Sequence, residues 1–266
     1  MIKTLFVFNL KENKGIIIGF TLIILLYSTI SIGMYDPSSS EALEAMLQMV
    51  PEALLKMLGF TSFGTEITSY VAHYLYGFIM VLFPAIFIII LGNRLIGKYQ
   101  SQGSLVYLIT MPYSRKKIVV TQLVFLITTL FFVLFINVAV MMIMASVMFP
   151  KTLQIGPFLM LNFVTFGVHF MLAGLTFFLS IWMADSSQAT GLSSLLLIGF
   201  FIIKMLSEIN EATHFLKYLS PYSLIHISHL LAGGIHGLLE LILTLIVGVA
   251  FFIGSIVLFD KKSIIV

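Results

Sequence analysis

The sequence contains no cysteine and very little charge. Without cysteine, disulfide bridges, thiolate metal sites and thiol nucleophiles are all excluded. Charged residues make up only 9% of the 266 residues, whereas 60% are hydrophobic. A soluble globular domain carries about 25% charged residues because its surface faces water. This chain cannot cover a soluble surface with so few charges, so its outer surface must face lipid.

Several motifs are absent as well. No Gly-x-x-x-x-Gly-Lys-Ser/Thr phosphate loop occurs, which excludes ATP hydrolysis by that route. The His-Glu-x-x-His pattern of metalloproteases does not occur either. The first apolar run is longer than that of a signal peptide and no small-x-small cleavage pattern follows it. We therefore expect a retained first span, and no catalytic residue, cofactor or metal in this chain.

Long apolar runs are abundant. About 20 apolar residues are needed for a helix to cross a bilayer, and six runs satisfy that length or come close to it. We predict an all-α integral membrane protein that forms a single transmembrane domain over residues 1–266, with spans at 15–34, 71–91, 118–148, 158–184, 189–205 and 237–259.

Three further segments are too polar to be simple spans. Residues 1–14 mix apolar side chains with lysines and asparagines, which predicts an interfacial helix. Residues 35–70 carry acidic side chains and leucines at helical spacing, which predicts an amphipathic segment on the outer membrane surface. Residues 206–236 combine histidines and charges with apolar residues. They predict a re-entrant helical hairpin before the last span, on the extracellular side.

The distribution of lysine and arginine predicts the orientation. Cytoplasmic loops carry an excess of these residues. One set of loops holds ten of them, and the other side holds Lys56, Lys151, Lys204 and Lys217. The first set is therefore assigned to the cytoplasm, with both termini on that side. It consists of Lys3, Lys11, Lys14, Arg94, Lys98, Arg115, Lys116, Lys117, Lys261 and Lys262.

Polar side chains inside apolar spans are candidates for a translocation path or gate, because they are costly in lipid. They are Asn137, His169, Lys204, Glu208 and Glu240, with Asn162 as a further buried amide. The simpler interpretation, which we favour, is hydrogen bonding between helices. Small residues such as Gly167 and Gly174 in the fourth span, and Gly191 and Gly199 in the fifth, predict close helix contacts.

Histidines near the end of the chain suggest an alternative. His226 and His229 stand three residues apart, His236 is nearby, and Glu211 precedes His214 by three. Such spacing can bring metal ligands to one helix face, so an intramembrane metal-dependent enzyme is the alternative function. Interfacial histidines that bond to backbone or lipid headgroups are the commoner case, and we favour that reading.

Residues 93–117 form a polar loop between the second and third spans. Within it, Leu105, Leu108 and Ile109 make a small apolar face on a helix of about two turns, which Pro112 ends. A basic cluster then returns the chain to the membrane. A short helix between two long spans can act as a lever, whereas a plain basic turn would only fix topology.

This loop resembles that of the membrane subunits of ATP-binding-cassette type 2 transporters. Those permeases show Gly-Ser/Thr-Leu, a hydrophobic pair, then Pro-x-Ser-Arg and a basic residue. Where the family often has glutamates before the glycine, this chain has Gln100, Ser101 and Gln102. The matching residues are Gly103, Ser104, Leu105, Leu108, Pro112, Ser114, Arg115 and Lys116.

The resemblance implies that the loop is a cytoplasmic coupling helix that docks on a partner ATPase. ATP and Mg²⁺ would be bound by two copies of that ATPase, and a second permease copy, identical or related, would complete the transporter. It implies an exporter in a bacterial plasma membrane, without nucleic acid partners. The scarcity of charge in the spans favours a hydrophobic or amphipathic cargo: a peptide, a lipid-like molecule or a drug, with amphipathic or antimicrobial peptides preferred.

Overall fold

The computed structural model describes the chain apart from residues 37–48, 58–65, 105–111, 184, 234 and 263–266. Its described part contains helices and no strand. The elements are α1 (Lys3–Gly33), α3 (Glu52–Met57), α4 (Ile67–Tyr76), α5 (Ile79–Ser101), α7 (Arg115–Met148), α8 (Ile155–Trp182), α9 (Ser186–Ser207), the 3₁₀ helices η2 (Glu211–Leu219) and η3 (Pro221–Leu224), α10 (Ile227–Ala232) and α11 (Ile235–Lys261).

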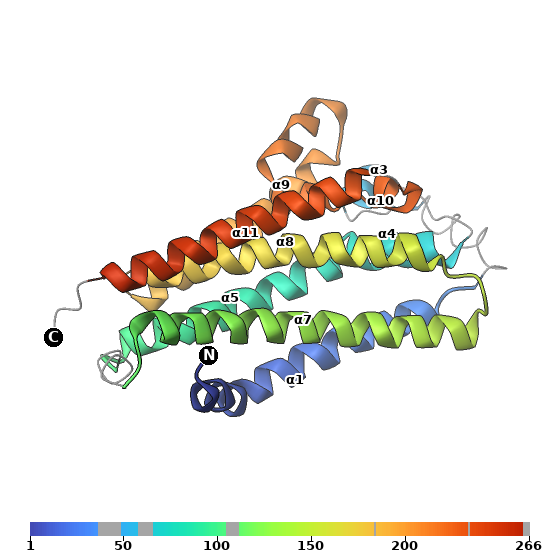
Figure 1. Cartoon of the computed structure of the whole chain (residues 1–266). Helices are drawn as coiled ribbons and strands as arrows, with labels where there is room; N and C mark the ends of the chain where they lie inside the picture. Colours follow the sequence, from blue (N-terminus) through green and yellow to red (C-terminus); the bar gives the residue numbers. More distant parts are fainter. Residues whose placement is uncertain (37–48, 58–65, 105–111, 184, 234, 263–266) are drawn as a thin grey trace.

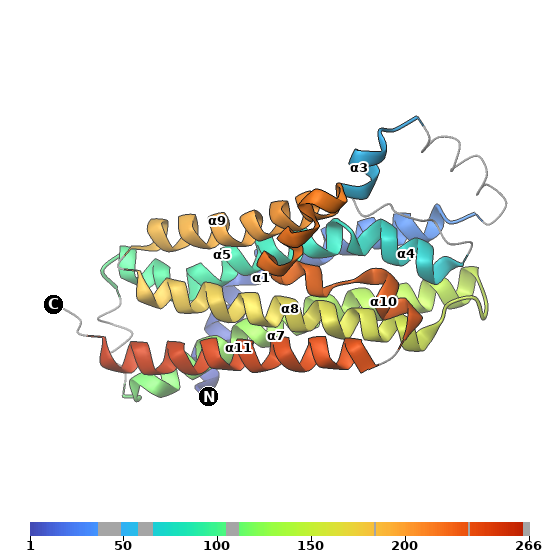
Figure 2. The same cartoon turned by 90° about the horizontal axis from the view of Figure 1, so that it is seen from above.

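In the described part of the chain six helices are long and apolar enough to cross a membrane, which agrees with the predicted number of spans. They are α1, α5, α7, α8, α9 and α11. They run lengthwise through one bundle (Figures 1 and 2), with the end of α5, the starts of α7 and α9 and the end of α11 at the same end. We call this the basic end, because it carries Lys98, Arg115, Lys116 and Lys262.

Helices α5 and α8 form the centre of the bundle. In their most apolar stretches 67% and 83% of the residues are buried, against 22% in α1 and α11. The outer helices expose large aliphatic side chains such as Leu195 and Ile246. Contiguous exposed apolar surface of this kind marks a membrane or protein interface, so the outer helices present their side chains to lipid.

The closest helix pair is α8 with α11, and glycines allow it. A Cβ atom added at Gly167 would lie 2.5 Å from Thr244 Oγ1, and one at Gly174 would lie 3.0 Å from the Gly248 carbonyl oxygen. These distances confirm the predicted close contacts of the fourth span. Gly191 and Gly199 on α9 have nothing within 4 Å of such an atom, so these two glycines make no close contact within the described part of the chain, although Ser193 of the same helix is buried.

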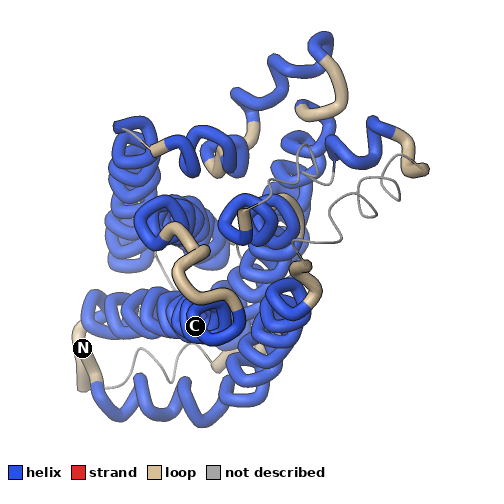
Figure 3. Tube along the Cα trace, turned by 90° about the vertical axis from the view of Figure 1, so that its right-hand side faces the viewer, coloured by secondary structure: helices blue, strands red, loops and turns tan. Residues whose placement is uncertain are grey.

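The amino-terminal segment joins the first span without a break. Helix α1 is continuous over Lys3–Gly33, and its axis bends: Figure 1 shows the first turns nearly end-on, and Figure 3 shows them side-on. These turns pack on α7. Thr121 Oγ1 accepts from the Ile2 N–H at 2.9 Å, and Asn9 Nδ2 donates to Gln122 Oε1 at 2.5 Å. That residues 1–14 lie in the membrane interface stays a prediction.

The predicted second span, 71–91, is divided between two helices. Helix α4 ends at Tyr76 and α5 starts at Ile79, with Phe78 in a non-helical conformation (φ −132°, ψ −61°). Pro84 follows within α5, and its missing N–H deprives the Met80 carbonyl of an intrahelical donor. We call Gly77–Val81 the α4–α5 break.

The segment before the last span folds as η2, η3 and the short helix α10 in place of two long helices. Figures 1 and 2 show η2 beside the bundle, short of the end at which α11 begins. Entry of this segment into the bilayer stays a prediction. Of the predicted surface segment 35–70, the structure describes α3 and the start of α4, and its residues 37–48 and 58–65 lie outside the described residues.

Candidate functional site

The predicted site residues fall into two groups in the structure, and the first group belongs to the loop at the basic end. Of the residues that match the transporter motif, Leu105 and Leu108 lie outside the described residues, whereas Gly103, Ser104, Pro112, Ser114, Arg115 and Lys116 are described. Gly103 terminates α5 with φ +64°, a left-handed conformation that glycine adopts without steric cost. Ser114 caps α7, where its Oγ accepts from the Lys117 N–H at 3.4 Å.

The start of α7 is tied to the end of α11. Arg115 Nη1 donates to the Lys262 carbonyl oxygen at 3.0 Å, and Lys116 Nζ lies 3.3 Å from Asp260 Oδ2. Lys262 Nζ in turn donates to the carbonyl oxygens of Ile181 and Met183 at the end of α8. A cation at this position satisfies carbonyl groups that have no intrahelical partner. The residues that follow the loop, at the start of α7, therefore connect α7 to α11 and, through Lys262, to α8.

The end of α5 makes the corresponding contacts on the other side. Lys98 forms an ion pair with Glu12 of α1. Ser101 Oγ donates to Asp185 Oδ1 at 3.3 Å and accepts from the Ser186 N–H at 3.1 Å, so it links α5 to the capped start of α9. The end of α5 and the start of α7, which border the loop, thus contact the other four spanning helices, α1, α8, α9 and α11, at the basic end.

The second part is the α4–α5 break, on which three predicted polar residues converge. Asn137 of α7 is buried with Nδ2 3.6 Å from Met80 Sδ. His169 of α8 and Lys204 of α9 reach backbone carbonyl oxygens of Val81 and Gly77. Inside a membrane every backbone polar group must find a partner within the protein. His169 and Lys204 supply such partners where the helix is interrupted, whereas Asn137 contacts only the side chain of Met80 there.

His169 is held between two carbonyl groups. Its Nδ1 lies 2.7 Å from the Thr165 oxygen and its Nε2 lies 3.1 Å from the Val81 oxygen, and the side chain is fully buried. A neutral imidazole carries one N–H and can donate to one of the two oxygens only. The Tyr222 ring lies beside it, with ring centroids 6.0 Å apart.

Lys204 is the most buried lysine at the far end of the bundle, with 3% of its surface exposed. Nζ lies 3.4 Å from the Gly77 oxygen and 3.6 Å from Glu208 Oε1. Burial raises the pKa of Glu208, and the neighbouring ammonium of Lys204 opposes that rise. Two of the candidate residues for a path or gate, Lys204 and Glu208, therefore form an ion pair beside the break.

Glu240 does not join this group. It lies on α11, half-buried, and its Oε2 has no hydrogen-bond partner among the described residues. Sequence analysis also missed Tyr76, whose hydroxyl donates to Asn162 Oδ1 at 2.7 Å directly before the break. Gly77 and Pro84, both inside the apolar run, were the available signals for this interruption.

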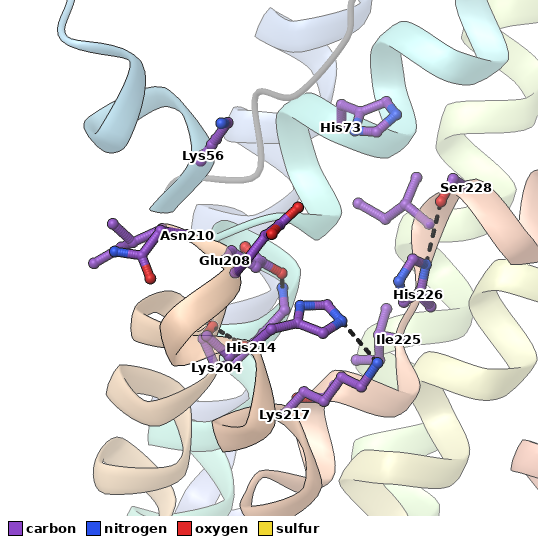
Figure 4. Close-up of a pocket in the computed structure, with 15 residues that line it drawn as sticks. Lys56, His73, Lys204, Glu208, Asn210, His214, Lys217, Ile225, His226 and Ser228 are labelled. Atoms are coloured by element: carbon purple, nitrogen blue, oxygen red, sulfur yellow. Dashed lines mark hydrogen bonds and ion pairs between the residues drawn. The ribbon is translucent and has the colours of Figure 1, made fainter.

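A polar cavity opens beside the break, between α3, α4, the end of α9, η2, η3 and α10 (Figure 4). Its volume is about 350 Å³. We call it the outer cavity. The residues that line it include Lys56, His73, Lys204, Glu208, Glu211, His214, Lys217, Ser223, His226 and Ser228.

The histidines do not assemble a metal centre in the described part of the chain, where no group of three or more potential ligands occurs. The rings of His226 and His229 are stacked with centroids 4.1 Å apart, which is not a ligand arrangement. Burial lowers the pKa of His226, and the neighbouring imidazoles and lysines lower it further. The described geometry therefore gives no support to the metal-enzyme alternative.

An apolar groove of about 710 Å³ lies between α7, α8 and α11. Its lining is almost wholly hydrocarbon and includes Phe131, Phe135, Met142, Phe166 and Leu241. Methionine and aromatic side chains adapt to irregular apolar molecules. This groove can hold an apolar chain.

Comparison with known proteins gives one family. A family model described as "ABC-2 family transporter protein" matches residues 4–264. No curated protein and no solved structure matches the chain. The match covers nearly the whole sequence.

Proposed function

The chain belongs to the ABC-2 family of transporter proteins, and from this premise we propose that it is the permease subunit of an ATP-driven exporter. Two copies of a separate ATPase bind ATP and Mg²⁺, and the loop 93–117 docks on them. A second permease chain completes the pathway. In this proposal the basic end faces the cytoplasm, in agreement with the positive-inside rule.

The observation that carries this proposal is the set of contacts at the basic end. The residues on both sides of the loop contact four other spanning helices: α1 through Glu12, α9 through Asp185, α11 through Asp260 and Lys262, and α8 through Lys262. A displacement imposed on the loop therefore acts on the whole bundle. Such an arrangement suits a lever driven by nucleotide binding on a partner.

The apolar groove supports a hydrophobic or amphipathic cargo. Its polar contribution is small, and the charged side chains of the spans are few and paired or near the ends. An ion or a sugar would need polar groups along its path to replace its water. A peptide with an apolar face, a lipid-like molecule or a drug would not need polar groups along its path.

The test replaces the two leucines of the predicted coupling helix. Leu105→Asp/Leu108→Asp places two charges on the face that docks on the ATPase, so ATPase capture and transport should fall at least about tenfold, since burying an unpaired charge is costly. Capture is measured by co-purification from a co-expressed pair, and transport by export of a fluorescent amphipathic peptide.

The matched control is Leu105→Val/Leu108→Val, which keeps the apolar face and should keep both activities. Size-exclusion chromatography of each variant verifies insertion and folding. Full ATPase capture and full transport by the aspartate variant would show that this helix does not couple the two subunits.

A further inference from the structure

The outer cavity gathers cations on the side of the molecule where cations are rare. Four lysines lie away from the basic end: Lys56, Lys151, Lys204 and Lys217. Three of them line this one cavity, and Lys151 does not. Figure 4 shows that the three come from different elements, namely α3, α9 and η2. A lysine is expensive to place near lipid, so this grouping indicates a common ligand.

The described lining holds a cation that is not paired with a carboxylate. Lys204 Nζ lies 3.6 Å from Glu208 Oε1, whereas Lys217 has no carboxylate within 4 Å among the described residues. The lowered pKa of His226 reflects burial first and then the surrounding cationic groups. The surroundings of Lys217 and His226 therefore favour an anion over a cation.

Lys217 is the clearest ligand group. Its Nζ lies 2.7 Å from His214 Nε2 and 5.1 Å from the centroid of the Tyr218 ring. Neither neighbour is a carboxylate, and an ammonium carries three N–H groups, so further donors remain for a ligand.

Two other groups in the cavity have unused hydrogen-bonding capacity. The contacts of Lys204 are 3.4 and 3.6 Å long, whereas charge-assisted hydrogen bonds have lengths of about 2.7–2.9 Å. Ser223 Oγ is buried without a hydrogen-bond partner in the described part of the chain. Such groups are rare in native structures unless something else binds them.

From these observations we infer that the outer cavity binds the anionic group, a phosphate or a carboxylate, of an amphiphile. Its volume of about 350 Å³ lies within the range of ligand pockets and suits a headgroup. The neighbouring helix η2 exposes Phe215, Tyr218 and Leu219. These side chains provide apolar contacts for the tail, which lies in the adjoining membrane.

Binding is measured on the full chain in nanodiscs of neutral lipid, without an ATPase, so the outcome is independent of the proposed transport function. The probes are dodecyl phosphate, dodecyltrimethylammonium and inorganic phosphate, each titrated by microscale thermophoresis. We expect dodecyl phosphate to bind at least about tenfold more tightly than the other two. Equal binding of the cationic amphiphile would overturn the anion site, and equal binding of inorganic phosphate would overturn the amphiphile.

The variants assign the binding to this cavity. Lys217→Gln removes the charge while keeping a polar side chain of similar length, and should weaken dodecyl phosphate binding about tenfold, the size expected for one hydrogen bond to a charged group. Lys217→Arg should restore most of it. Lys151→Gln removes a lysine of the same side that does not line the cavity, and should change nothing. Unaltered binding by folded Lys217→Gln, or an equal loss in Lys151→Gln, would place the site elsewhere.

Discussion

Replacing Gly248 with alanine tests how closely α8 and α11 are packed. A Cβ atom at this position would lie 2.5 Å from Phe170 Cδ1, 2.7 Å from Phe170 Cε1 and 3.1 Å from Met171 Cα. Carbon atoms pack best at about 3.5–4.0 Å. The Phe170 ring would have to move by about 1 Å, and the α8 backbone by a few tenths of an ångström.

The ring cannot move without cost. It packs edge-on against Phe252 with centroids 4.9 Å apart, and an aromatic pair of this kind contributes about 0.5–1.5 kcal/mol. Overpacking of a well-packed site costs about 1–3 kcal/mol, and the higher helix propensity of alanine offsets up to about 1 kcal/mol of it. We expect Gly248→Ala to lower the free energy of unfolding by about 1–2 kcal/mol.

Unfolding is followed by titrating mixed micelles with SDS and recording the fluorescence of Trp182, the single tryptophan, at the end of α8. Gly199→Ala is the matched control, since nothing lies within 4 Å of a Cβ atom there. Combining Gly248→Ala with Phe170→Leu should recover part of the loss, because the ring atoms that clash are removed. Equal stability of Gly248→Ala and Gly199→Ala would refute the close approach of these helices.

Two further predictions concern the α4–α5 break. Lys204→Met leaves the carboxylate of Glu208 without its partner, so the free energy of unfolding should fall by about 1–3 kcal/mol, less than for a fully buried pair because that carboxylate is about one-third exposed. The double variant Lys204→Met/Glu208→Gln should regain most of this loss in the same SDS titration. A double variant as unstable as the single one would contradict the pairing. Tyr76→Phe removes the hydroxyl that donates to Asn162 and should cost about 1 kcal/mol, whereas Tyr27→Phe, at an exposed position, should cost much less.

Span number and family membership could be predicted from the sequence because both depend on local information. An apolar run of sufficient length can cross a bilayer whatever its neighbours are. Five of the six predicted runs each correspond to one long helix, and the run 71–91 is divided between α4 and the long helix α5. The residues from Gly103 to Lys116 are contiguous, so they could be matched to the transporter family before the fold was known. The family match over residues 4–264 confirms that resemblance.

The α4–α5 break could not be predicted from local sequence information. Gly77 and Pro84 are both tolerated in membrane helices when neighbours satisfy the backbone, so neither residue alone signals an interruption. The neighbours that do so are His169 and Lys204, which lie 92 and 127 residues from Gly77 in the sequence, and Asn137, 60 residues away, packs beside them. Their positions within apolar runs predict that they are buried, but only the packing of α7, α8 and α9 around α5 shows what they face.

The sequence also did not reveal which face of each helix contacts another helix. Glycines in two neighbouring spans looked alike in the sequence, yet Gly167 faces α11 whereas Gly199 faces open space. Which side of an almost uniformly apolar helix meets a partner depends on tertiary packing. The outer cavity could not be predicted either, because only tertiary packing brings its lysines together. Lys204 and Lys217 belong to separate elements, α9 and η2, and Lys56 comes from a segment more than a hundred residues earlier.

The α4–α5 break also determines how the second membrane crossing can deform. An unbroken helix is a stiff beam that carries bending from one end to the other. Here Gly77 and the non-helical Phe78 separate two helices of 10 and 23 residues, and side chains from three other helices lie beside this break. A tilt of α5 that starts at Lys98 therefore does not pass to α4 through an unbroken helix. The wall of the outer cavity, to which α4 contributes His73, can keep its own orientation while the other end of the crossing tilts.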